Sequence, residues 1–194
     1  MMTQDKVSEL KANIRTAQRE RNRSLPPGER DRAASRVAAI LTGQLAWGNA
    51  RAVLLYAALP DEIPVEPLME AAWVAQKTVT LPFYNCESDL YDVRVVKSAR
   101  DLVLGKFGVL EPEAACPAFP ANRLDFSLIP GLAFDLRGRR VGRGKGFYDR
   151  LLMNVRGTRC GIGFDHQIEA EVPVEPHDIL LDCILTPSRW VWVT

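Results

Sequence analysis

The chain of 194 residues lacks the features that mark several common classes of protein. Its 25 Lys and Arg residues are balanced by 24 Asp and Glu residues, which leaves a formal net charge of +1. A general nucleic-acid or membrane-surface protein is therefore disfavoured, because such partners select an excess of positive charge. The longest uninterrupted apolar stretch, 52–59, is far shorter than the roughly 18 to 20 residues that a bilayer requires. The N-terminal segment mixes charges of both signs and has no apolar core, so it does not read as a secretory signal.

Residues that commonly bind zinc are also scarce. The two histidines, His166 and His177, have no cysteine or histidine at metal-ligand spacing, so we do not expect them to ligate a metal. The cysteines form no CxxC pair, which argues against a zinc site and against a thioredoxin-like redox motif. We expect reduced, mostly buried thiols in a cytoplasmic protein. The four cysteines are Cys86, Cys116, Cys160 and Cys183.

What the sequence does contain is an ordinary globular composition, with 47% hydrophobic and 25% charged residues. A domain of this length buries about 70% of the surface that its unfolded chain exposes, so it needs no metal or disulfide for stability. Abundant apolar residues and a near-zero net charge argue against intrinsic disorder. We expect one domain over residues 1–194.

The hydrophobic pattern predicts strands that alternate with helices. Val7, Leu10, Ile14 and Ala17 follow helical spacing over 4–22, and the prolines and glycine of 25–28 end that helix. The run 53–58 is typical of a strand that is covered on both faces. The fold expected is an α/β domain with a mostly parallel central sheet flanked by helices, and such sheets bind ligands beyond the carboxyl ends of their strands. The other expected elements are helices over 29–46, 65–76 and 149–155, strands over 78–83, 92–96, 126–129 and 160–164, apolar closing segments over 179–185 and 190–193, and a surface loop over 112–120.

Positive charge is concentrated in the segment 135–150, DLRGRRVGRGKGFYDR. It holds six cations and two anions, a local charge of +4 (6 − 2) in a chain whose total is +1. Its glycines Gly142, Gly144 and Gly146 allow backbone N–H groups to converge on an anion, and a helix is expected to start near Phe147. This combination indicates a polyphosphate site, the alternative being a solvated basic turn at 137–138. The glycine spacing matches neither the Rossmann motif, the P-loop nor the protein-kinase loop.

The first helix repeats this charge pattern. Lys11, Arg15 and Arg19 share one stripe, with Arg23 just beyond it. Residues 6–23 hold six cations and two anions, again +4 (6 − 2). Such stripes are often solvated helix faces, but two basic clusters in a neutral protein favour joint binding of one polyanionic ligand.

Three acidic residues are candidates for the same site. Asp149 falls in the first turn of the expected helix, where it could hold Mg²⁺ against a phosphate or simply complement the helix dipole. Glu62 follows the first strand, where binding residues collect in parallel sheets. Asp178 is a candidate second magnesium ligand, or an ordinary cap for the segment that follows it.

The motifs together resemble the 5-formyltetrahydrofolate cyclo-ligase family, also called methenyltetrahydrofolate synthetases. The resemblance runs from about Lys11 to Thr186, and its most specific part is the glycine–arginine signature. Ile14 stands where the family often has leucine, and Phe147 where it often has tyrosine, so the phenol hydroxyl of that position is absent here. The matching residues are Lys11, Ile14 and Arg15, Asp61-Glu62, Phe107-Gly108-Val109-Leu110-Glu111-Pro112, Pro130-Gly131-Leu132-Ala133-Phe134-Asp135, Gly138, Arg140, Gly142-Arg143-Gly144-Lys145-Gly146-Phe147-Tyr148-Asp149, Gln167 and His177-Asp178.

The resemblance implies a fold similar to the sugar-phosphate isomerase and CoA-transferase group, with ATP, Mg²⁺ and a reduced folate as ligands. It implies the conversion of 5-formyltetrahydrofolate and ATP into 5,10-methenyltetrahydrofolate, ADP and phosphate. By the same resemblance, the ATP-binding residues are expected to be Lys11, Arg15, Arg140, Val141, Gly142, Arg143, Gly144, Lys145, Gly146, Phe147 and Tyr148.

The remaining roles follow from the same resemblance. Arg143 and Lys145 would neutralise charge on the transferring phosphoryl group, and Asp149 and Asp178 would coordinate Mg²⁺. Glu62 would accept hydrogen bonds from the N–H groups of the pterin ring. We expect a monomer that acts on a small molecule, whose folate could carry a polyglutamate tail, without a nucleic-acid or membrane partner. The folate-binding residues would be Ala57, Glu62, Arg143, Gly144, Lys145, Gly146 and Phe147.

Two other functions remain open from the residues alone. The nucleotide site could serve a different amide or carboxylate acceptor. The chain could instead be a nucleotide- or RNA-binding module without catalysis, although it has no basic-aromatic platform on which bases would stack.

Overall fold

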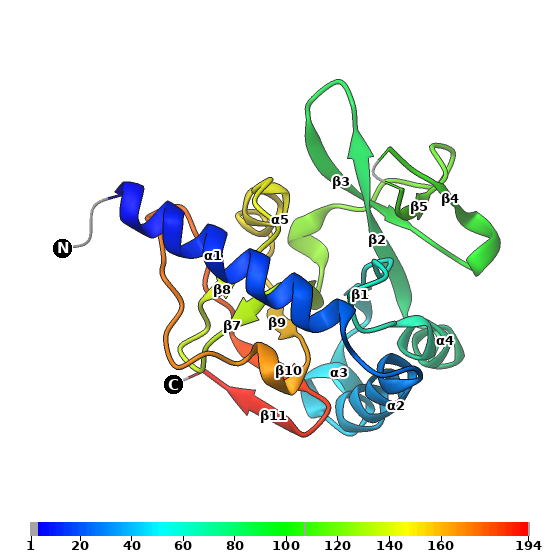
Figure 1. Cartoon of the computed structure of the whole chain (residues 1–194). Helices are drawn as coiled ribbons and strands as arrows, with labels where there is room; N and C mark the ends of the chain where they lie inside the picture. The colour runs from blue at the N-terminus through cyan, green and yellow to red at the C-terminus, as the bar shows by residue number, and fades with distance from the viewer. Residues whose placement is uncertain (1–3, 107, 194) are drawn as a thin grey trace.

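A seven-stranded sheet forms the centre of the computed structural model, which describes residues 4–106 and 108–193 (Figure 1). Its five inner strands are parallel, and an antiparallel strand closes each edge. This arrangement confirms the expected α/β domain with a mostly parallel sheet. In spatial order the strands are β11 (Arg189–Trp192), β10 (Cys183–Thr186), β9 (Thr158–Ile162), β6 (Phe126–Pro130), β1 (Ala52–Leu54), β2 (Thr78–Asn85) and β3 (Leu90–Val95).

Both faces of the sheet are buried. Because neighbouring residues of a strand point to opposite sides, an inner strand contributes to an apolar cluster on each face. Val53 and Leu128 pack in one apolar cluster, and the adjacent Leu54 and Ile129 pack in another. The first cluster includes side chains of α2 (Glu29–Thr42), α3 (Leu45–Asn49) and α4 (Glu66–Val74), while the second is covered by α5 (Phe147–Leu152). The continuous apolar runs of the inner strands follow from this double burial.

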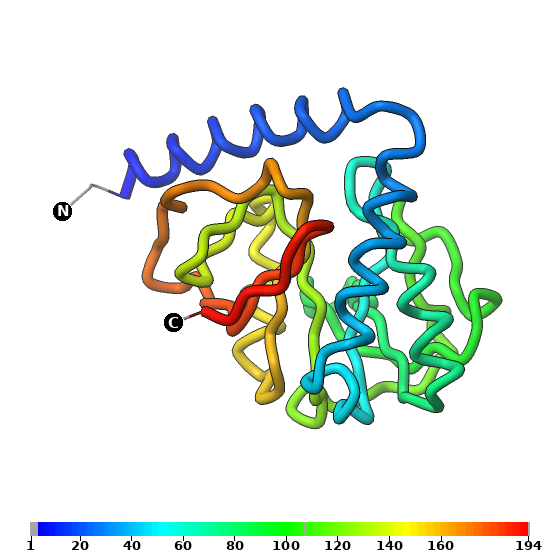
Figure 2. Tube along the Cα trace, turned by 90° about the horizontal axis from the view of Figure 1, so that it is seen from below, coloured from blue at the N-terminus to red at the C-terminus, as the bar shows by residue number. Residues whose placement is uncertain are grey.

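A long first helix, α1 (Gln4–Arg23), lies outside these layers. Figure 2 shows it lying across one end of the molecule, above the chain segments of the second half and leading into α2. Its buried residues include polar Lys11, Gln18 and Asn22, so this helix packs through polar contacts as well as apolar ones. None of the helices in the described ranges combines the length and apolar character needed to span a bilayer.

Two short hairpins and three 3₁₀ turns complete the described part of the chain. The hairpins pair β4 (Leu102–Leu104) with β5 (Leu110–Pro112), and β7 (Ala133–Phe134) with β8 (Arg140–Val141). The 3₁₀ turns are η1 (Ala99–Asp101), η2 (Ala121–Arg123) and η3 (Asp165–Gln167).

Most of the expected elements are present, with corrected bounds. The helix expected over 29–46 breaks after Thr42, and α3 follows as a separate short helix. The first strand ends at Leu54 rather than at 58, because the chain leaves the sheet to form a loop. The segment 179–185 becomes a strand only from Cys183. The hairpins β4–β5 and β7–β8 were not predicted, because two- and three-residue strands carry too little periodic pattern. Phe107, part of the motif before Pro112, lies outside the described residues.

The cysteines are all free, but their burial is mixed. Cys160 and Cys183 are buried in the sheet, whereas Cys86 is exposed and Cys116 is partly exposed. The expectation of mostly buried thiols is therefore wrong for Cys86, which follows the end of β2 at the turn into β3.

The β7–β8 hairpin is held by a fully buried carboxylate, that of Asp135. Asp135 Oδ1 accepts hydrogen bonds from the backbone N–H groups of Arg137 and Arg139. Asp135 Oδ2 accepts from Arg139 Nε and from the backbone N–H of Val172. One side chain thus closes the hairpin turn and ties it to the 169–178 segment.

We expect Asp135→Asn to lower the free energy of unfolding by about 3–5 kcal/mol, because it removes one partner of a buried ion pair and leaves the other uncompensated. Urea denaturation of the purified protein measures this loss. Glu70→Gln, at an exposed position on α4, is the control and should change the value by no more than about 0.5 kcal/mol. Equal stability of the two variants would show that Asp135 does not hold the hairpin.

Candidate active site

A cavity of about 780 Å³ opens at the carboxyl ends of β1 and β6. The next strand in the sheet, β2, pairs on one side of β1, and the later strand β6 pairs on its other side. The strand order therefore reverses between β1 and β6. The loops that follow such strands diverge and leave a crevice, which is the usual ligand site of open α/β sheets. Tyr56, Ala57 and Glu62 line it from the loop after β1, and Pro130 and Gly131 line it from the end of β6.

The glycine-rich segment between β8 and α5 forms one wall of the cavity. Gly144 has a φ of 97° and Gly146 a φ of 66°, a left-handed conformation that side chains with a Cβ rarely adopt. Gly146 is also the N-cap residue of α5. The alternation of glycines and cations therefore has a structural cause, because the loop must bend twice while it presents Arg143 and Lys145 to the cavity.

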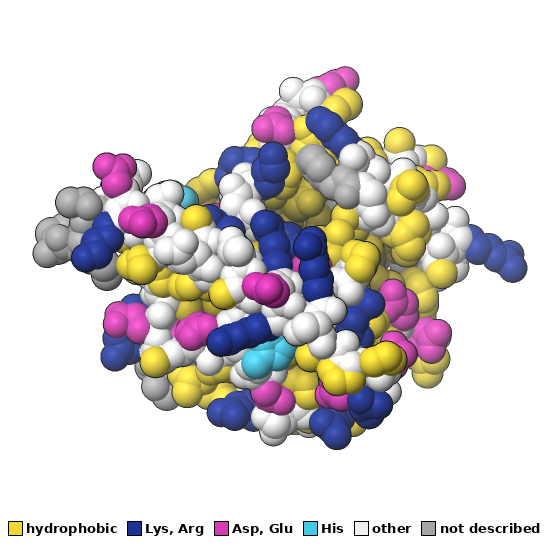
Figure 3. All heavy atoms as spheres, in the orientation of Figure 1, with side chains coloured by type: hydrophobic (Ala, Val, Ile, Leu, Met, Phe, Trp, Pro, Cys, Tyr) yellow, Lys and Arg dark blue, Asp and Glu magenta, His cyan; other side chains and the backbone are white. Residues whose placement is uncertain are grey.

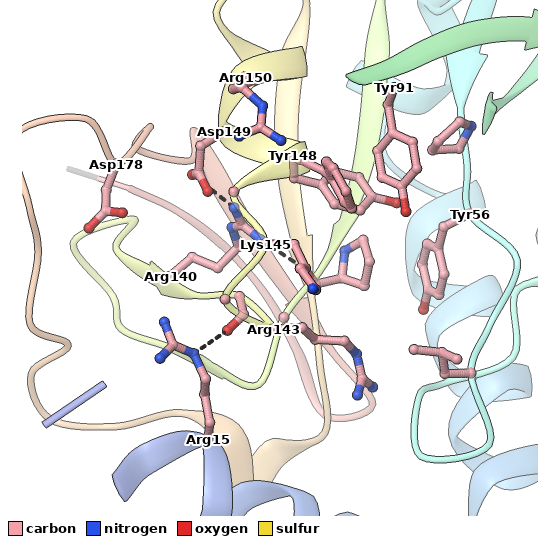
Figure 4. Close-up of a pocket in the computed structure, with 18 of the residues that line it drawn as sticks. Arg15, Tyr56, Tyr91, Arg140, Arg143, Lys145, Tyr148, Asp149, Arg150 and Asp178 are labelled. Atoms are coloured by element: carbon pink, nitrogen blue, oxygen red, sulfur yellow. Dashed lines mark hydrogen bonds and ion pairs between the residues drawn. The ribbon is translucent and has the colours of Figure 1, made fainter. Parts of the chain in front are cut away.

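The basic stripe of α1 faces this loop rather than solvent. Arg15 Nε donates to the carbonyl of Gly142 at 3.0 Å, and Arg19 Nη2 donates to the carbonyl of Arg143 at 3.4 Å. Figure 4 shows Arg15 reaching from α1 to the loop. Figure 3 shows Lys and Arg side chains gathered around the hollow on this face. The interpretation of the stripe as a solvated helix face is wrong for these positions, and it holds only for the exposed Arg23.

Lys11 lines the same end of the cavity as Arg15. Its side chain is almost fully buried and lies between two carboxylates. Its Nζ lies 2.7 Å from Glu175 Oε2 and 2.5 Å from Asp178 Oδ2. The ammonium group lowers the pKa of Glu175 through their hydrogen bond. Asp178 Oδ2 also accepts from the backbone N–H of Glu175, so it organises its own loop rather than capping the segment after it.

Carboxylates at this end of the cavity fit a divalent cation. Glu175, His177 and Asp178 place potential ligand atoms within 4.8 Å of one another, and Asp149 stands outside that group. Asp149 lines the cavity from the first turn of α5 and forms an ion pair with Arg140, Asp149 Oδ1 to Arg140 Nη2, at 2.9 Å. Carboxylate oxygens are the protein ligands that Mg²⁺ prefers, together with phosphate oxygens and water.

Arg143 joins the glycine loop to the loop after β1. Its Nε lies 2.9 Å from Glu62 Oε1, and its Nη2 lies 2.6 Å from Asp61 Oδ1. Glu62 Oε2 accepts a further hydrogen bond from the backbone N–H of Leu59 at 3.0 Å. Burial raises the pKa of the Glu62 carboxyl, and the neighbouring Arg143 guanidinium opposes that rise.

The opposite end of the cavity is aromatic. Tyr56, Tyr91 and Tyr148 gather there, away from the Arg15 and Asp178 side chains (Figure 4). Tyr148 borders the charged end, because the Arg140 guanidinium lies 5.8 Å from the centre of its ring. The ring of Phe147 packs 4.9 Å from that of Tyr91 and 5.6 Å from that of Tyr84, centroid to centroid. Burial raises the pKa values of Tyr56 and Tyr148 well above 10.0, so both phenols stay protonated at neutral pH. The cavity thus has a charged end and an aromatic end, with Arg143 and Lys145 between them.

Lys145 has an exposed side chain on the cavity wall. Within the described part of the chain, its Nζ is in no hydrogen bond or ion pair. It differs in this from Lys11, Arg140 and Arg143, whose charges are already paired with carboxylates.

The structure brings nearly all of the sequence-predicted site residues to this one cavity. The exception is Val141, which is buried in a separate apolar cluster with Ala133 and Val172. Gln167, from the family signature, is likewise buried and binds the carbonyls of Gly131 and Leu132. Those that do line the cavity are Lys11, Arg15, Ala57, Glu62, Arg140, Gly142, Arg143, Gly144, Lys145, Gly146, Phe147, Tyr148, Asp149 and Asp178.

Sequence reasoning missed several lining residues. Tyr56 and Tyr91 carry no local signal, because one aromatic residue in a strand pattern is ordinary core. Glu175 could have been found from its position three residues before Asp178, a spacing that places two carboxylates in one loop. The others that were missed are Ser8, Leu59, Pro82 and Met153. Further lining residues stood in the basic clusters or in the family motif but had no binding role assigned to them: Arg19, Val109, Leu110, Glu111, Pro130, Gly131, Arg150 and His177.

Comparison with known proteins shows the family of the chain. The family model described as "5-formyltetrahydrofolate cyclo-ligase family" matches residues 7–187. The chain belongs to this family.

Several relatives match over nearly their whole length. The 5-formyltetrahydrofolate cyclo-ligase of Escherichia coli K12 is 32% identical over 181 residues, which cover 90% of this chain and 99% of the relative. The 5-formyltetrahydrofolate cyclo-ligase of Mycolicibacterium smegmatis is 31% identical, and the match covers 93% of this chain and 95% of the relative. The solved structure of Aquifex aeolicus 5,10-methenyltetrahydrofolate synthetase superposes with a TM-score of 0.85 at 30% identity, over 95% of this chain and 93% of the other.

These matches confirm the resemblance and the prediction that the chain is an enzyme of this family. The match over 7–187 agrees closely with the extent expected from the motifs, 11–186. The likeness to the sugar-phosphate isomerase and CoA-transferase group stays a prediction.

The raised pKa of Glu62 can be measured directly. In ¹³C-labelled protein, we expect the Glu62 carboxyl signal to titrate above 4.5, because burial disfavours the charged form. Arg143→Met should raise this pKa further, since it removes the opposing charge, whereas Lys97→Met at an exposed distant site should not. A midpoint at or below 4.5 in the wild-type protein would contradict the assignment.

The same shift predicts a pH dependence of stability. A carboxyl whose folded-state pKa is raised binds its proton more tightly in the folded state than in the unfolded state. The contribution of Glu62 to the free energy of unfolding is therefore fully present below the unfolded pKa and is lost as the pH rises through the folded value.

Proposed function

We propose that this enzyme converts 5-formyltetrahydrofolate to 5,10-methenyltetrahydrofolate at the expense of ATP, with release of ADP and phosphate. The observation that carries the proposal is that one cavity has a charged end and an aromatic end, which meet at the glycine loop. A polyphosphate suits the first end and a flat heteroaromatic ring the second. The names of the relatives describe this conversion from both sides, one as the ligase of the substrate and one as the synthetase of the product.

ATP would bind at the charged end. Lys11, Arg15 and Arg140 supply positive charge there, and the glycine loop supplies backbone N–H groups that approach phosphate oxygens closely. Val141 would contribute through its backbone alone, because its side chain is buried on the other side of β8. Lys11 would exchange a carboxylate for a phosphate when the nucleotide binds.

The folate would bind at the aromatic end. Ala57, without a larger side chain, leaves room beside Tyr56 for a planar ring, and Glu62 presents a carboxylate to the N–H groups of a pterin. Phe147 and the rings around it supply the apolar wall. Residues 143–147 would contact both substrates, as the family resemblance implies.

The chemistry follows from this placement. The formyl oxygen attacks the γ-phosphorus of ATP, so an O–P bond forms and the bond to the ADP oxygen breaks. N10 of the folate then attacks the formyl carbon and loses its proton, and the C–O bond breaks as phosphate departs with the oxygen. Such a reaction needs positioning and charge neutralisation rather than a nucleophilic side chain. Arg143 and Lys145, between the two ends, would neutralise charge on the transferring phosphoryl group.

Mg²⁺ would be held by Asp149 and Asp178, and it would neutralise charge on the nucleotide phosphates. These two residues are already paired with Arg140 and Lys11, so the protein's own cations occupy the carboxylates until the nucleotide arrives.

The four free cysteines fit a reducing compartment, and we propose a cytoplasmic location. We also propose that the protein acts as a monomer.

The near-ultraviolet absorbance of purified protein with 5-formyltetrahydrofolate and Mg²⁺, before and after addition of ATP, tests the reaction. We expect an ATP-dependent rise of the band of the methenyl product. If ATP binds but no band rises, the folate assignment is lost and the nucleotide site would serve another acceptor.

We expect Lys145→Ala to fold normally and to lose a factor of about 10²–10³ in kcat, because Lys145 Nζ would contact charge that develops in the transition state. Initial rates at saturating ATP and folate measure this loss. Lys97→Ala, which removes an exposed lysine far from the cavity, is the matched control. Turnover of Lys145→Ala near that of the wild type would remove Lys145 from the chemistry.

The alternative of a nucleic-acid-binding module is not favoured by the site, because the α1 stripe is turned into the cavity and bound to the glycine loop. Salt separates the two readings: affinity for RNA would fall steeply with salt, whereas an enclosed nucleotide site responds much less.

A further inference from the structure

The loop after β1 is held from behind by two side chains that do not line the cavity. Asn22, at the end of α1 and 3% exposed, donates from Nδ2 to the carbonyl of Asp61 at 2.9 Å. Arg30, in the first turns of α2, donates from Nε to the carbonyl of Glu62 at 3.0 Å and from Nη2 to that of Leu59 at 3.1 Å. Three backbone carbonyls of one short loop are thus bound by two helices.

Asn22 is itself fixed by a further contact. Its Oδ1 lies 2.7 Å from His166 Nε2, and because Nδ2 donates to Asp61, the histidine nitrogen is the donor. The ring of His166 stacks on that of Phe164, with centroids 5.5 Å apart and planes inclined by 6°. A contact chain therefore runs from η3 through Asn22 to the backbone of Asp61.

On its cavity side, the same loop is held by Arg143 alone among the cations of the glycine loop. Arg143 contacts both Asp61 and Glu62, and it is the group that a substrate carrying negative charge would attract. When Arg143 turns to such a ligand, the position of Glu62 depends on the backbone that carries it. This backbone lies between β1 and α4 and forms no helix or strand.

We propose that Asn22 and Arg30 are positioning residues for the folate subsite: they hold the backbone of 59–62 so that the Glu62 carboxylate stays directed into the cavity while Arg143 is engaged by substrate. The inference rests on the proposed role of Glu62 in folate binding. It assigns these residues no part in binding the nucleotide, whose proposed side chains are those of Lys11 and Arg15, earlier in α1, of Arg140 on β8 and of the glycine loop.

Ligand affinities test the inference. We expect Arg30→Met and Asn22→Leu to raise the Kd of 5-formyltetrahydrofolate about tenfold, which is the usual effect of losing about one hydrogen bond. The Kd of Mg·ATP should stay within about twofold of the wild-type value. Arg30→Lys, which keeps a donor for one carbonyl, should fall between. Arg36→Met, on the same helix with an exposed side chain, is the matched control. Parallel weakening of both ligands, or folate affinity equal to that of the control, would overturn the inference.

Hydrogen exchange gives a readout that needs no turnover. The backbone N–H of Glu62 donates to the carbonyl of Leu59, so its exchange rate reports on the loop. We expect faster exchange over 59–63 in Arg30→Met and Asn22→Leu than in Arg36→Met, when each variant is measured at the same interval below its own thermal midpoint. If the wild type shows no ATP-dependent product, the proposed function fails, while this comparison still decides whether the two residues hold the loop; unchanged exchange would refute them as positioning residues.

Discussion

Parallel pairing of β1 with both β2 and β6 is the constraint on which the rest of the structure depends. Parallel strands need long connections, so the segments after β1 and β6 must leave the sheet in opposite directions. The space between them becomes the cavity, and the residues that end these strands become its floor. The later segments, including the glycine loop and the acidic 175–178 loop, are then brought to this rim by strands that add on one side only, β9 and β10.

Charge in this cavity is largely balanced before any ligand binds. Lys11 is matched by Glu175 and Asp178, Arg140 by Asp149, and Arg143 by Asp61 and Glu62. Buried or half-buried charges without partners would be costly, so a site built for polyanions must hold its cations with carboxylates in the free protein. A phosphate or a magnesium ion can then replace a protein partner instead of meeting an uncompensated charge. Two of these carboxylates, those of Asp61 and Glu62, also hold the loop after β1 against the glycine loop through Arg143.

Much of the fold and of the site was readable from the chain. Helical spacing of Val7, Leu10 and Ile14 predicted α1, and the continuous apolar runs predicted the inner strands. The charge of 135–150 predicted the anion-binding loop. The family resemblance supplied the folate and the roles, which no spacing in the chain would have indicated. Of the two boundaries that failed, the end of α2 falls at Gly43, a local stop signal that the expected helix over 29–46 ran through. The other, after Leu54, falls where the chain leaves the sheet although the apolar run continues.

The sequence alone determined the α/β class, the glycine loop and the cationic stripe of α1, because these depend on local periodicity, on residues that tolerate positive φ and on charge density. Only the tertiary structure decided which face of α1 is buried and which carboxylate pairs with which cation. It alone placed Asn22 and Arg30 behind Glu62, and the aromatic rings of Tyr56, Tyr91 and Tyr148 at one end of a shared cavity. These contacts join residues that are far apart in the chain, 164 positions in the case of Lys11 and Glu175. Their geometry is set by how the helices and loops pack around the sheet, so it cannot be predicted from local sequence patterns.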